Sequence, residues 1–93
     1  MIKVLKLVSG DDVISELEIN QNIAILKNPQ KFIVTPEGLA NMPLMPFSKD
    51  EEFKISMDHI LLISEPEDDL KNGYNSQFGS GIVIAKNNMV ITE

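Results

Sequence analysis

The 93-residue sequence predicts a mainly β fold with a single small barrel domain and a C-terminal tail. Short runs of alternating apolar and polar residues predict strands, and the glycine, proline, asparagine and aspartate clusters between them predict turns. No stretch before residue 64 has the spacing of an amphipathic helix. These observations predict a small bent sheet or barrel over residues 1–64. The tail, residues 65–93, is expected to add a short helix and a candidate terminal hairpin.

The first three strands are predicted in the N-terminal part of the sequence. Residues 3–8 and 12–19 are expected to pair across a turn at Gly10, because glycine accepts the positive φ that tight reversals need. A third strand is predicted over residues 23–27 and resumes at 31–35. Proline cannot donate a ladder hydrogen bond, so Pro29 predicts a bend or a bulge between the two parts.

The next apolar stretch, residues 39–47, contains two prolines and therefore predicts an edge strand or an extended loop. Its apolar residues have two interpretations of equal weight. They pack into the core beside an edge that resists aggregation, or they form a subunit interface. Two further strands are predicted at residues 53–57 and 59–63, the second of them buried.

The tail begins with a predicted helix over residues 66–78. Ser64 and Glu67 have the spacing of a capping box, and Pro66 suits a first helical turn. Leu70, Tyr74 and Phe78 form one apolar stripe, which packs either on its own barrel or on a neighbouring subunit. Beyond the helix, the apolar segments 82–85 and 89–92 flank a turn-like sequence and predict the hairpin.

The charge balance argues against a polyanionic partner. Eight lysines face fourteen acidic residues, the net charge is −6, and the sequence contains no arginine. Nucleic-acid affinity depends on clustered cations, and arginine is the side chain best suited to phosphate and guanine. Only a local patch made from Lys3, Lys6, Lys27 or Lys31 would serve a phosphate backbone.

Residues that support catalysis are scarce. The sequence has no cysteine and a single histidine, His59, which is expected at a strand edge or an interface. A pairing of Ser56 with His59 stays open, but no nucleophile elbow or phosphate-binding glycine loop accompanies it. Residues 68–73 have some resemblance to a calcium-binding loop. However, Leu70 occupies a position that needs an oxygen ligand, so the pattern fails. We therefore expect no enzyme, cofactor or metal site, no membrane span, and a cytoplasmic protein.

Two segments resemble the signatures of the Sm-like (LSm) family. From Leu7 to Leu17 the sequence has the spacing of the first signature, with Gly10 at the turn and Ser15 as the small residue. Residues 55–63 are similar, more loosely, to the second signature. The resemblance covers residues 3–64 and implies a five-stranded open barrel that assembles into homo-oligomeric rings of five to seven subunits. In this family, the fourth strand of one subunit pairs with the fifth of the next, which here implies strands within 39–57 and 59–63.

The resemblance also implies single-stranded RNA as a partner, with the ring acting as a scaffold or chaperone. The positions that match the family's RNA-binding loops depart from its pattern. Residues 20–24 replace the usual acid or histidine, methionine and asparagine, and Ser56 and Met57 replace the usual basic residue and glycine. The family resemblance favours RNA, whereas the charge favours a structural or protein-interaction ring with a protein partner at the acidic tail or at residues 39–47. Of the two, RNA binding is the expected function, by a narrow margin, and the ring without RNA is the alternative. Compact members with such tails resemble phage-encoded versions. The candidate RNA-binding residues are Asn20, Asn22, Ser56, Asp58 and His59.

Overall fold

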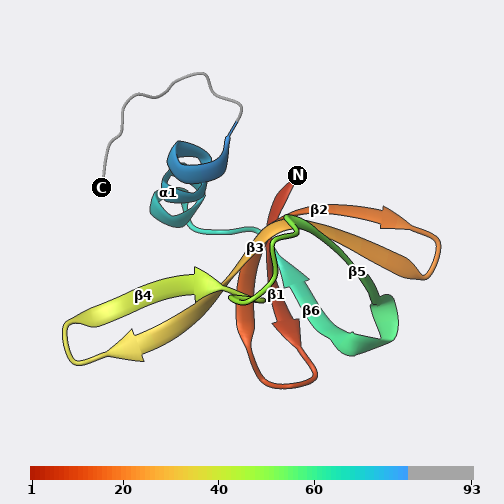
Figure 1. The fold of residues 1–93 in the computed structure, drawn as a ribbon, viewed down its shortest axis with the longest axis horizontal. Coiled ribbons are helices and arrows are strands. Elements are labelled where there is room, and N and C mark those ends of the chain that lie inside the picture. Colours follow the sequence, from red (N-terminus) through yellow and green to blue (C-terminus); the bar gives the residue numbers. More distant parts are fainter. Residues whose placement is uncertain (80–93) are drawn as a thin grey trace.

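The computed structural model describes residues 1–79, which form one antiparallel sheet of six strands and a single α-helix (Figure 1). The predicted terminal hairpin lies outside these residues. The strands are β1 (Ile2–Leu7), β2 (Asp12–Asn20), β3 (Ile23–Thr35), β4 (Gly38–Pro43), β5 (Glu52–Ser56) and β6 (Ile60–Ser64); a 3-10 turn, η1 (Met57–His59), precedes β6, and the helix is α1 (Asp68–Phe78).

The mainly β, bent-sheet fold is confirmed, with six strands where five were predicted. The strand order is β4-β3-β2-β1-β6, and β5 pairs with β3 beside β4. The extra strand arises because the chain turns away between Pro43 and Glu52, and proline in this segment prevents a continuous ladder. Both pieces then follow one edge of β3: β5 pairs with its first half, and β4 pairs with its second half. Figure 1 shows β4 and the end of β3 as an arm that leaves the rest of the sheet.

A β-bulge bends the centre of the sheet. The register between β2 and β3 shifts because Ile14 pairs with Gln30 but Glu16 pairs with Lys27. The extra residue belongs to β3, where Asn28 adopts a positive φ of 51° and precedes Pro29. The predicted irregularity at Pro29 is therefore a bulge within a continuous strand.

The two faces of the bent sheet carry separate apolar clusters, because successive strand residues point to opposite sides. On one face, β1 contributes Leu5 and Leu7 to a core that also contains Val13, Leu17, Ala24 and Leu26. On the other face, Ile2 and Ile14 pack against α1. The helix thus covers one face of the sheet. The other face lies on the inner side of the bend, where the bent sheet itself buries it.

The helix packs on its own sheet, which settles the two interpretations of its apolar stripe. Tyr74 is buried against Ile2 and Ile14, and Leu70 and Phe78 lie partly buried beside it. The hydrogen-bonding pattern of α1 begins at Asp68, two residues after the predicted start. Glu67 occupies the N-cap without a side-chain hydrogen bond, so the predicted capping box does not form. Ser64 remains the last residue of β6.

Candidate functional site

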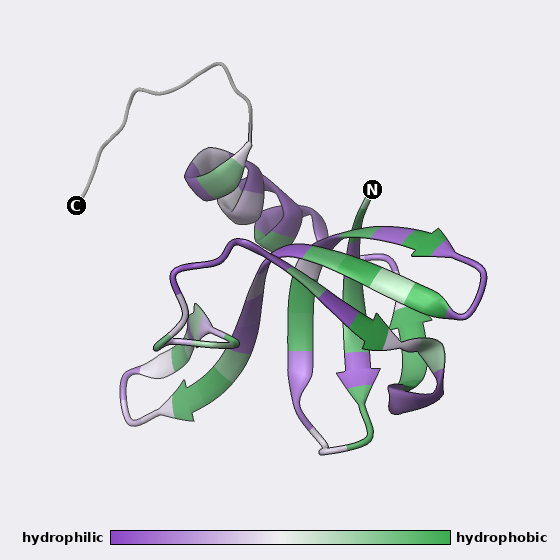
Figure 2. Ribbon diagram, turned by 45° about the vertical axis from the view of Figure 1, so that its right-hand side comes forward, coloured by the Kyte–Doolittle hydropathy of each residue, from purple (hydrophilic) through white to green (hydrophobic). Residues whose placement is uncertain are grey.

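The strand β6 has an exposed apolar surface, which corrects the prediction that it is buried. Leu61, Leu62 and Ile63 are 60%, 64% and 39% exposed. In the part of the chain that the structure describes, β6 pairs with β1 alone, so its other edge has no partner strand. Figure 2 colours this strand as hydrophobic. The sequence predicts this strand but not its exposure, because an apolar run of this length is typical of a central strand.

The neighbouring strand β5 has a second open edge. Within residues 1–79, β5 pairs only with β3, and the sheet does not close between β5 and β6. Unpaired N–H and C=O groups along a strand edge form a template for another strand. Protective lysines or prolines are absent from β6, whose sequence is Ile-Leu-Leu-Ile-Ser. The described part of the chain therefore presents two edges that two copies of it can join.

The candidate RNA-binding residues lie in two turns that the fold brings together. Asn20 and Asn22 flank the β2–β3 turn, where Gln21 has a positive φ of 57°. The N–H of Met57 donates to the carbonyl oxygen of Asn22 at 2.9 Å, and Ile23 pairs with Ser56. The two turns lie on the same side of the sheet in Figure 1.

The side chains in these turns are mostly exposed. Asn20, Asn22, Asp58 and His59 are exposed, whereas Ser56 is half-buried. Ser56 caps η1, because its hydroxyl oxygen accepts from the N–H of Asp58 at 3.1 Å. The carbonyl oxygen of His59 accepts from the N–H of Val8 at 2.9 Å, which joins the β1–β2 turn to the group. The pairing of Ser56 with His59 that the sequence leaves open is not among the hydrogen bonds of the described residues.

Two of the four lysines of the predicted phosphate-binding patch are paired with carboxylates. Lys3 forms an ion pair with Glu65, and the Nζ of Lys6 lies 2.8 Å from Oδ1 of Asp12. The hydrogen bond and the charge of Lys3 hold the pKa of Glu65 below its ordinary value of 4.5. Lys27 lies in a shallow hollow lined also by three glutamates, Glu16, Glu18 and Glu52. Three of the four lysines of this predicted patch therefore lie beside carboxylates, which weakens the attraction of the patch for a polyanion.

Tyr74 ties α1 to the bulge, and the sequence analysis gave it no polar role. Its hydroxyl donates to the carbonyl oxygen of Lys27 at 2.5 Å and accepts from the N–H of Glu16 at 3.0 Å. Both partners are backbone groups beside the register shift. The phenol therefore supplies hydrogen bonds at the point where the ladder between β2 and β3 is interrupted. Ser15, fully buried, also donates to the carbonyl oxygen of Lys27 at 3.1 Å. The helix thereby fixes the bend that positions the open edges.

Comparisons with protein-family models and with curated proteins find no match to this chain. In residues 1–79, no group of three or more histidine or acidic side chains is placed to hold a metal ion. None of the described helices has the length and apolar character needed to cross a membrane.

Proposed function

We propose that this protein is an Sm-like subunit that assembles into a homo-oligomeric ring, and that the ring acts as a protein-interaction scaffold. The single observation that carries the proposal is the exposed apolar edge strand β6. Pairing β6 of one copy with β5 of the next satisfies both open edges and covers Leu61 and Leu62. Because each copy supplies both edges, the contact is head-to-tail, and such a contact forms a ring when the rotation between copies closes. The resemblance to the Sm-like family implies a closed ring of five to seven subunits.

The charge distribution supports a protein rather than a nucleic acid as the ring's partner. Each subunit adds a net charge of −6 to the ring, and Lys3 and Lys6 already pair with carboxylates. A protein partner with a basic surface suits such a ring, because complementary potentials steer association.

Single-stranded RNA is the second candidate, and one observation favours it. The two turns that hold Asn20, Asn22, Asp58 and His59 are adjacent, and ring closure would repeat them around one face. Amide and imidazole groups can hydrogen-bond to unpaired bases, and an imidazole can stack on them.

Retention of labelled oligo-U and oligo-A on filters, across a salt series and with a sized sample, separates the two candidates. We expect no salt-dependent retention, because acidic residues outnumber the lysines, and Lys3 and Lys6 are paired with carboxylates. Retention that falls linearly with the logarithm of salt concentration, and that is lost in the His59→Ala and Asn22→Ala variants, would contradict the scaffold and establish RNA binding. The Thr35→Ala variant, at the far end of β3, is the matched control.

A further inference from the structure

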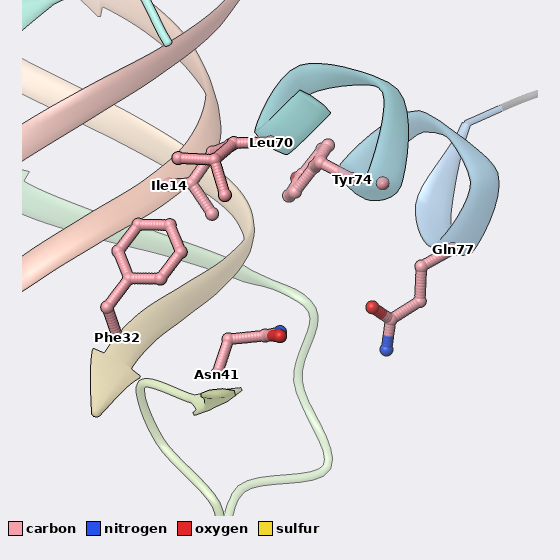
Figure 3. Close-up of a pocket in the computed structure, with 7 residues that line it drawn as sticks. Ile14, Phe32, Asn41, Leu70, Tyr74 and Gln77 are labelled. Atoms are coloured by element: carbon pink, nitrogen blue, oxygen red, sulfur yellow. The ribbon is translucent and has the colours of Figure 1, made fainter. Parts of the chain in front are cut away.

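A hollow between α1 and the arm has no role in the proposed ring (Figure 3). Its lining comes from β2, β3, β4 and α1, and none of the described residues that line it belongs to β5 or β6. Its volume is about 170 Å³, close to that of an engineered protein cavity of about 150 Å³ that binds benzene. The hollow therefore has room for a molecule with one six-membered ring, whether or not the protein assembles.

The walls of the hollow are apolar. Ile14 and Tyr74 are buried beside it, and Phe32 and Leu70 are half-buried. The hydroxyl of Tyr74 already bonds to the backbone at the bulge, so this residue offers its ring to the hollow. Among the described residues that line the hollow, none is charged. A charged ligand would lose its hydration there without gaining an opposite charge, so the lining favours a neutral ligand.

Two exposed amide side chains complete the lining. Figure 3 shows Asn41 of β4 and Gln77 of α1 on the same side of the hollow. Asn41 donates from Nδ2 to Oε1 of Gln30 at 2.8 Å, which fixes its side chain and leaves its oxygen without a partner among residues 1–79. In the same residues, the amide of Gln77 has no hydrogen-bond partner. Because each amide both donates and accepts, a carboxamide group of a ligand is a matching partner for them.

Gly73 keeps space open on the helix side of the hollow. It lies in the middle of α1, where glycine is less favourable than alanine. Neither conformation nor packing requires glycine at this position, because its φ is not positive and an added methyl group would meet no packed neighbour within 4 Å. Gly73 lines the hollow, so a larger side chain would extend into it. The property that this glycine provides is therefore the space itself.

We propose that the hollow between α1 and the arm binds a small neutral molecule that has one aromatic ring and one carboxamide group. The aromatic ring of the ligand packs against the rings of Phe32 and Tyr74. The carboxamide bonds to the amides of Asn41 and Gln77, which fixes the orientation of the ligand. The site lies apart from the proposed ring contact, so it is a binding activity beyond the proposed function.

Titration of the full chain with benzamide, followed by the backbone amide shifts in NMR spectra, tests the proposal. Because benzamide is small, we expect the shifts to saturate at millimolar concentration, and we expect them at Phe32, at Asn41 and over residues 70–77. Benzoate has the same ring but carries a charge, so it should bind at least about tenfold more weakly. Benzamide shifts that do not saturate or that lie elsewhere, or benzoate binding of equal strength, would contradict the proposal.

Filling the hollow separates binding from folding. The Gly73→Leu variant should weaken benzamide binding at least about tenfold, because its side chain occupies the hollow. It should also raise the urea midpoint, because leucine favours a helix more than glycine does, so the loss of binding cannot come from unfolding. The control, Asn75→Leu, places the same side chain on α1 outside the hollow and should keep the affinity. Unchanged benzamide affinity in Gly73→Leu would overturn the proposal.

Removing one amide tests the orientation of the ligand. The Gln77→Ala variant should lower the affinity for benzamide severalfold and leave the affinity for toluene unchanged, because toluene has the ring without the carboxamide. An equal loss for both ligands, or no loss for benzamide, would show that the amides do not receive the carboxamide and would contradict the proposal.

Discussion

Replacing Leu62 with glutamate is expected to convert the proposed ring into monomers at micromolar concentration. In the single chain, the Leu62 side chain is 64% exposed, so the substitution should leave the fold intact. Glutamate also lies opposite Lys6 in the β1–β6 register and adds no like charge there. At the proposed contact, however, the carboxylate would be desolvated, which costs several kcal/mol. Since about 1.4 kcal/mol is a factor of ten in affinity, we expect assembly to need at least about a hundredfold more protein.

Light scattering and circular dichroism of the variant measure its mass and its fold. The matched control is Val34→Glu, which introduces the same charge at an apolar side chain that is 88% exposed but far from β5 and β6 in register. We expect the control to keep the mass of the unmodified protein. A Leu62→Glu variant that also keeps this mass would exclude β6 from the interface.

The second large effect is expected at Tyr74. The Tyr74→Phe variant leaves the N–H of Glu16 without its hydroxyl partner and removes one hydrogen bond to the carbonyl oxygen of Lys27. We expect this loss to lower the free energy of unfolding by about 1–3 kcal/mol. The Tyr74→Ala variant also removes the buried ring, for a total of about 3–5 kcal/mol. Urea unfolding measures both losses. A Tyr74→Phe variant as stable as the unmodified chain would show that the hydroxyl does not secure the bulge.

The same phenol predicts a loss of stability at high pH. Burial raises the pKa of Tyr74 above its ordinary value of 10.0, against the opposing effect of the hydrogen bond from the Glu16 backbone. The folded state therefore holds the proton more tightly than the unfolded chain. This contribution to stability is complete below about pH 10 and is lost as the pH rises through the folded-state pKa. The Tyr74→Phe variant, whose chain then has no tyrosine, is the reference for other titrating groups.

The strands and turns could be predicted because their signals are local. The positive φ of Gly10, at 95°, agrees with the predicted turn, and the bulge at Pro29 follows from proline's missing donor. The helix stripe of Leu70, Tyr74 and Phe78 was also predicted, because its spacing is set by the helical period. The sequence could not choose the face on which this stripe packs, because that choice depends on the tertiary fold.

The properties of the candidate site depend on contacts between distant residues, so the sequence could not reveal them. An apolar run such as β6 looks the same whether its edge is paired or open. The ion pair of Lys3 with Glu65 joins residues that lie 62 positions apart in the sequence, and it removes a cation that composition alone would leave available. The hydroxyl of Tyr74 finds its backbone partners only after the bulge has formed.

Disulfide trapping across the proposed contact tests the central claim most directly. Lys54 of β5 and Leu62 of β6 both lie on the side of the sheet away from the inner core, because their neighbours Phe53 and Ile63 pair with the buried Leu26 and Leu5. Oxidation of a chain with Lys54→Cys and Leu62→Cys, or with Glu52→Cys and Leu62→Cys to cover a two-residue shift in register, should give a ladder of linked chains. We expect the ladder to end at five to seven times the 10.4-kDa mass of one chain. A control with Lys54→Cys and Val34→Cys should give no ladder. Only monomers, or dimers without larger species, from both β5–β6 pairs would contradict the ring.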